Sequence, residues 1–82
     1  MKQKGLRVET PATYEIQVQG VLGPEWSGRL QGLGITVKEF SDRLPETTLI
    51  GSLKDQAALL GVLNALFALQ LPLLLVYCSR YG

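Results

Sequence analysis

The chain contains no histidine and a single cysteine among its 82 residues. The absence of histidine excludes Ser-His-Asp and Cys-His catalytic arrangements within this chain, and it excludes zinc sites that use histidine ligands. The lone Cys78 excludes an internal disulfide, and in its apolar surroundings we expect it to be a small buried hydrophobe. These absences favour a cytoplasmic protein with no catalytic residues, no metal site and no cofactor.

Charge and aromatic side chains are also sparse. The chain carries 8 basic and 7 acidic side chains, a net charge of +1, so it produces no strong field that would attract a polyanion. RNA-binding sheets stack bases on aromatic side chains of their central strands, where this sequence offers only Tyr14. The carboxylates are spread over different predicted elements at polar, solvated positions. We therefore expect neither nucleic-acid binding nor enzymatic activity.

The longest uncharged run extends from Gln56 to Ser79. A run of this length is sufficient to cross a bilayer as a helix, so a C-terminal membrane anchor is one alternative. Pro72 divides the run, however, and the residue types change after it. This division favours a helix of about 15 residues that ends near Gln70, followed by a buried strand over residues 73–78.

The remaining elements follow from alternation and turn residues. Residues 1–13 are polar and basic and predict a flexible leader, whereas residues 14–82 form a single small domain. Strict alternation from residue 14 to residue 21 predicts a half-buried strand. Two further strands, residues 35–40 and 47–52, are joined by turn-forming residues and should make a hairpin.

Two segments are candidates for helices. Residues 24–31 can form two turns, with Pro24 at the first helical position, or an irregular loop pinned by Trp26. The second helix begins after Asp55, which either caps it directly or acts with Ser52 as a variant capping box. The long helix should then run from Gln56 through the first half of the uncharged run.

This order of elements predicts an α+β fold. The expected architecture is a four-stranded antiparallel sheet of the split βαβ, ferredoxin-like type, with a short or irregular first helix and one long apolar helix. The alternative is a βββαβ arrangement, in which residues 23–34 do not cross over the sheet.

The predicted long helix has more apolar surface than a small sheet requires from one helix face. Three exposed leucine-sized side chains would leave roughly 300 Å² of apolar surface in water and forfeit about 7 kcal/mol, comparable to the stability of a small domain. Either the first helix and the leader cover this surface, or a homo-oligomer or an accessory protein partner does. The candidate contact residues are Ala57, Gly61, Asn64 and Ala68, which form a stripe at helical spacing, with Leu60 and Phe67 beside it.

A second hypothesis is a small-molecule-sensing regulatory domain similar to the ACT type. Its ligand would lie at the first strand-to-helix loop, where Gly20, Gly23 and Pro24 allow close approach to the backbone. The same residues are ordinary turn formers, so the loop has a purely structural explanation as well.

Three motifs carry a resemblance. They are YEIQVQG at residues 14–20, DQAALLG at residues 55–61 and LPLL at residues 71–74. The sequence resembles small uncharacterised bacterial proteins that share a YEIxVxG first strand and a DQAALxG helix start followed by LPLL. The resemblance implies a soluble, stand-alone domain without an assigned activity, so it transfers no functional residues.

Overall fold

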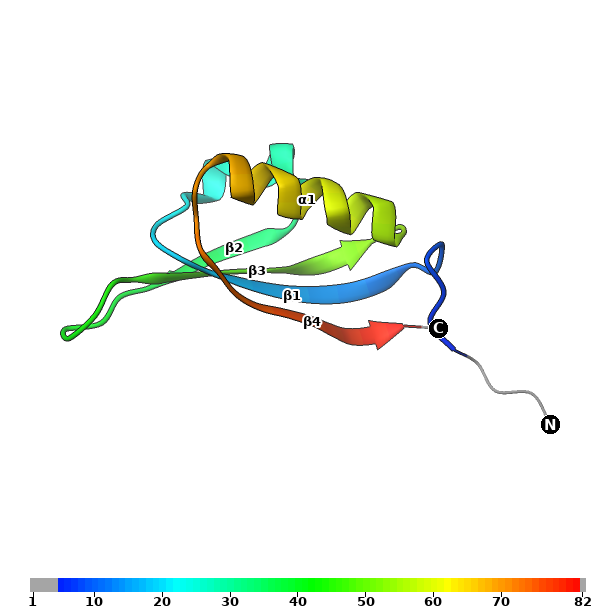
Figure 1. The fold of residues 1–82 in the computed structure, drawn as a ribbon, viewed down its shortest axis with the longest axis horizontal. Coiled ribbons are helices and arrows are strands. Elements are labelled where there is room, and N and C mark those ends of the chain that lie inside the picture. Colours follow the sequence, from blue (N-terminus) through cyan, green and yellow to red (C-terminus); the bar gives the residue numbers. More distant parts are fainter. Residues whose placement is uncertain (1–4, 82) are drawn as a thin grey trace.

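The computed structural model describes residues 5–81, which form one antiparallel sheet with two helical segments on one face (Figure 1). The elements are β1 (Ala12–Gln19), η1 (Pro24–Leu30), β2 (Gly34–Lys38), β3 (Glu46–Leu53), α1 (Gln56–Ala68) and β4 (Leu73–Tyr81). The strands lie in the order β2-β3-β1-β4, and each pairs antiparallel with its neighbours. The α-helix α1 and the 3-10 helix η1 cover one face, and within the described residues no helix covers the other.

β1 confirms the alternation predicted from the sequence, although it begins at Ala12 and ends at Gln19. Its even-numbered residues are buried toward the helices, and its odd-numbered residues lie half-buried on the open face. β1 pairs with β3 on one side and with β4 on the other, so it is a central strand. Gly20 ends it with φ of 113°, a conformation that side chains other than glycine rarely adopt.

β2 and β3 form the predicted hairpin, with Lys38 opposite Glu46 at its closed end. In the loop, the Arg43 guanidinium lies 3.7 Å from the centre of the Phe40 ring. Its Nε is also 3.8 Å from a carboxylate oxygen of Glu46. These contacts link the loop to the start of β3.

The segment between β1 and β2 is a 3-10 helix, not an α-helix. Three residues per turn align positions i and i+3, and the Arg29 guanidinium accordingly lies 5.3 Å from the centre of the Trp26 ring. Glycines at 28 and 32 weaken an α-helix here. Instead, Ser27 Oγ donates a hydrogen bond of 2.6 Å to the Leu33 carbonyl and ties η1 to the entry of β2.

The predicted ferredoxin-like fold is therefore wrong. That fold packs two α-helices on its sheet, whereas residues 5–81 contain a single α-helix of 13 residues and the short η1. The βββαβ alternative does not describe the chain either, because β3 lies between β1 and β2 and residues 20–33 must cross over it. The observed fold is a four-stranded antiparallel sheet with one α-helix.

The prediction of a long apolar helix is also wrong. α1 begins where predicted, because the Asp55 carboxylate accepts a 2.8 Å hydrogen bond from the amide of Ala58, and the Val8 carbonyl accepts a 2.7 Å bond from the amide of Gln56. It ends early because Gln70 adopts the left-handed conformation, with φ of 60°. The Gln70 amide donates a hydrogen bond to the Phe67 carbonyl, and the Leu71 amide donates one to the Leu66 carbonyl. These two bonds form a Schellman motif, which terminates the helix.

The hydrophobic core lies between the sheet and the two helical segments. α1 contributes a narrow face of three buried residues, Ala58, Val62 and Leu66, at four-residue spacing. The other core side chains come from β1, β3, η1 and the loops around η1: Ala12, Tyr14, Ile16, Val18, Leu22, Leu30, Leu33, Leu49 and Leu53. β4 contributes only the half-buried Cys78 to this packing.

Candidate interaction surface

β4 lies at one edge of the sheet and, within the described residues, pairs only with β1. Its nine residues include a single charge, Arg80. The prediction that residues 73–78 form a buried strand is wrong. An edge strand has a neighbouring strand on one side only. In addition, α1 packs over β3, so β4 lies at the edge of the sheet that the helix does not cover (Figure 1).

Pairing with β1 shows that β4 is apolar on both faces. Val76 lies opposite the fully buried Ile16, so its side chain points to the helix side of the sheet. Tyr77 lies opposite Glu15, on the open face. A half-buried strand would alternate apolar and polar residues, but β4 has no such alternation between Leu73 and Tyr77.

The large apolar side chains of β4 are extensively exposed. Leu73 and Tyr77, for example, expose 53% and 54% of their surfaces. The full set is Leu73, Leu74, Leu75, Val76, Tyr77 and Tyr81. Soluble monomers generally protect their edge strands with charges, prolines, short length or β-bulges. The strand between Leu73 and Ser79 has no charge and no proline, and its pairing with β1 is regular over residues 75–78, between two register shifts.

The outer side of α1 adds to this apolar area. All six candidate contact residues predicted from the sequence are exposed: Ala57, Leu60, Gly61, Asn64, Phe67 and Ala68. Phe67 exposes 82% of its surface, an unusual arrangement for a phenylalanine in a well-formed helix. The structure thus places these residues on the solvent side of α1, and their contact with a partner stays a prediction.

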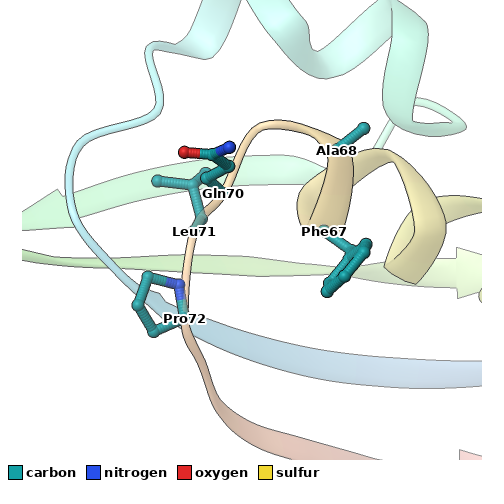
Figure 2. Close-up of a pocket in the computed structure, with 5 residues that line it drawn as sticks. All are labelled: Phe67, Ala68, Gln70, Leu71 and Pro72. Carbon is teal, nitrogen blue, oxygen red and sulfur yellow. The ribbon is translucent and has the colours of Figure 1, made fainter.

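Two adjoining hollows lie where α1 passes into β4, with volumes of ≈ 430 and ≈ 450 Å³. Both are lined by Phe67, Leu71 and Pro72. In Figure 2 Phe67 projects from the last turn of α1, beside the segment in which the chain descends through Leu71 and Pro72 toward β4. An open, apolar hollow of this kind suits an apolar side chain from a partner.

We define the β4–α1 surface as these exposed apolar groups together. Its members are Phe67, Leu73, Leu74, Leu75, Val76, Tyr77 and Tyr81, with the hollows between Phe67 and Pro72, one of which Leu73 also lines. Contiguous apolar patches larger than a few hundred Å² are uncommon on monomeric proteins and mark interaction sites.

The loop proposed as a ligand site is occupied by internal contacts. The Gly20 amide donates a 2.7 Å hydrogen bond to the Pro45 carbonyl, and the Gly20 carbonyl accepts a 2.6 Å bond from the Thr47 hydroxyl. Gly23 precedes η1 as its N-cap, and Pro24 is the first residue of η1. All three residues lie in the connection between β1 and η1, where they end the strand and begin the 3-10 helix.

The cysteine and the carboxylates of the described residues do not form a further site. Cys78 is half-buried, and its Sγ lies 3.9 Å from the Arg80 carbonyl oxygen. Within residues 5–81, no three side chains of the histidine, cysteine, aspartate or glutamate type gather closely enough to hold a metal ion. None of the helices in this part of the chain combines the length and the apolar character needed to cross a membrane.

The fold and the surface define a small α+β domain with an exposed apolar edge strand. Residues 13–77 match the family described as a domain of unknown function, DUF8691, and because the match covers more than half of the chain, this protein belongs to that family. No curated protein and no solved structure matches the chain. The function is therefore argued from the β4–α1 surface.

From the sequence, the long helix, the sheet or both were expected to mediate self-association, but the residues named for it lie on α1, and the exposed apolar side chains of β4 were not identified. The uninterrupted apolar block after Pro72 was interpreted as a buried strand, which is its usual meaning. The missing signal was positional: a last strand that pairs with the first can still be an edge strand, and then both of its apolar faces are exposed.

Proposed function

We propose that this protein is a non-catalytic interaction module that associates with a second copy of itself through the β4–α1 surface. The observation that supports the proposal most directly is β4, an apolar edge strand exposed on both faces beside the exposed Phe67. The homo-oligomer predicted from the sequence thus acquires a specific surface, composed of sheet edge as well as helix.

The exposed apolar area is sufficient for association even when only part of it is buried. The exposed side chains of β4, with Phe67, present on the order of 700 Å² per copy, close to the ~800 Å² that each partner of a typical interface buries. Burying half of this surface on both copies gains on the order of 17 kcal/mol in gross terms at about 25 cal/mol per Å². Association costs about 4–15 kcal/mol, so a favourable balance is expected.

The charge distribution also favours association through apolar contact. Between Leu73 and Ser79 there is no charge to repel an identical strand or to attract a nucleic acid. Contact of this kind does not depend on ion pairs, so raising the salt concentration should leave the association unchanged or strengthen it.

Light scattering coupled to size-exclusion chromatography tests the proposal. The purified chain, diluted through the micromolar range, should show a concentration-dependent species of twice the chain mass. A Phe67→Ser variant should shift the equilibrium toward monomer. Leu44→Ser is the matched control, because Leu44 is a similarly large exposed apolar residue in the β2–β3 loop, outside the surface.

A monomer at every concentration, without binding of a hydrophobic dye, would overturn the proposal. So would equal effects of the two substitutions, because loss of any exposed apolar residue would then explain the result.

We also infer a cytoplasmic setting and a bacterial origin. The first is supported by the single, half-buried cysteine in a chain that has no disulfide partner for it. The second depends on the resemblance of the YEIQVQG, DQAALLG and LPLL segments to small bacterial proteins. Fractionation of cells that express the tagged chain tests the location.

A further inference from the structure

The two edges of the sheet differ in how they are protected against pairing. β2 is five residues long, ends in Lys38 and leads into a charged loop. β4 is nine residues long, and from Leu73 to Ser79 it has no charge and no proline. A long apolar edge presents backbone amides and carbonyls that remain available for another strand, and β4 pairs regularly with β1 over residues 75–78, between two register shifts.

We propose that two copies of this chain pair β4 against β4 in antiparallel orientation, so that their four-stranded sheets join into one continuous sheet. This inference depends on the proposed self-association and specifies its geometry. A twofold axis makes such an interface isologous, because every contact from one copy to its partner occurs twice.

Arg80 distinguishes the two possible orientations. In a parallel pair the two Arg80 side chains would lie on neighbouring strands, about 4.8 Å apart in the hydrogen-bonding direction. In an antiparallel pair centred on Tyr77, the middle residue of β4, they lie at opposite ends, roughly 20 Å apart along the strands. Like charges directly opposite each other are destabilising, which favours the antiparallel pair.

Centring the axis on Tyr77 also matches side chains across the junction. Tyr77 then meets the partner copy's equivalent residue on the open face, which allows an aromatic pair. Val76 lies opposite position 78 of the other copy, so a valine and a cysteine meet on the helix side. Leu73 lies opposite position 81, where a leucine and a tyrosine pair. Each of these pairs is apolar on both sides, whereas Leu75 and Leu74 lie opposite positions 79 and 80, a serine and an arginine.

Cross-linking tests the register directly. In a Cys78→Ala background, Tyr77→Cys places the new thiol opposite the same thiol of the second copy, at a separation that permits a disulfide. Mild oxidation should convert most of this variant to a covalent dimer. Thr36→Cys in the same background lies on the other edge strand, β2, and should give only a trace of covalent dimer.

A second variant tests the same register with the native cysteine retained. Val76→Cys places its new thiol opposite position 78 of the other copy, so two reciprocal disulfides should form. The unmodified chain, with Cys78 alone, should cross-link poorly because the two Cys78 side chains are offset along the strands.

Hydrogen exchange on the unmodified chain provides a measurement independent of any substitution. On association, the amides of residues 73–79 that point away from β1 should exchange about tenfold more slowly at concentrations well above the dissociation constant, while those of β2 should not change. Protection of β2 in place of β4 would overturn the inference.

The outcomes separate the two proposals. A dimer by light scattering that cross-links at neither Tyr77 nor Val76, and shows no added protection of β4, overturns edge pairing and leaves self-association intact. A chain that is monomeric throughout overturns both.

Discussion

The hydroxyl of Thr47 connects the start of β3 to the loop that follows β1, because it donates a 2.6 Å hydrogen bond to the Gly20 carbonyl. It also accepts a 3.1 Å bond from the Leu22 amide. Thr47 is a polar residue buried in the core, with none of its surface exposed. A single side chain therefore satisfies two backbone groups at the point where the chain leaves the central strand.

Replacing Thr47 with valine should lower the free energy of unfolding by about 2–4 kcal/mol. Valine preserves the shape but removes both hydrogen bonds, and each buried group left unsatisfied costs about 1–3 kcal/mol. Thr48→Val is the matched control, because Thr48 points to the opposite face and is only half-buried. Chemical denaturation of the two variants checks this prediction, and equal midpoints would contradict it.

Gly20→Ala should also destabilise the fold, by more than about 1 kcal/mol. The φ of 113° is unfavourable for alanine, and an added Cβ would lie 2.9 Å from Cδ2 of Leu71 in the α1–β4 connection. Gly28→Ala is the control, because a Cβ there meets nothing within 4 Å and alanine favours helical geometry. Thermal unfolding should show a clear decrease for the first variant and little change for the second.

Gln70→Gly should stabilise the protein by about 1 kcal/mol. Gln70 occupies the left-handed position that ends α1, where glycine avoids the steric cost of a side chain. Gln70→Ala removes the same polar group but retains the Cβ, so it should give no comparable gain. If both variants raised the unfolding midpoint equally, backbone conformation would not be the cause.

Tyr14→Phe should leave stability unchanged or raise it slightly. Tyr14 is 2% exposed, and its hydroxyl has no hydrogen-bond partner within residues 5–81. Removing a buried polar atom without a partner eliminates its desolvation cost and preserves the packing of the ring. A decrease of 1 kcal/mol or more in the free energy of unfolding would contradict this account.

Several local features were predictable from the sequence because they depend on neighbouring residues. Asp55 caps α1, since an aspartate before an apolar helical segment can reach the amide three residues later. The alternation in β1 and the turn residues after β2 likewise predicted a strand and a hairpin. Pro72 divided the uncharged run at the correct place, between α1 and β4.

The prediction of the first crossover failed for a physical reason. The spacing of Trp26 and Leu30 fits one face of an α-helix, but the segment is short and contains glycine. Tertiary contacts then favoured 3-10 geometry, in which Ser27 reaches the Leu33 carbonyl. With only this short segment and α1 on the sheet, the ferredoxin-like architecture was not realised.

The sequence by itself determined that this chain has an apolar second half, a helix capped by Asp55 and a strand after Pro72. Only the tertiary structure decided which of these apolar side chains are buried. Strand order places β4 at the edge, and the position of α1 over β3 leaves both faces of β4 exposed. Burial depends on contacts between segments distant in the chain, so the same apolar block can be core or contact surface.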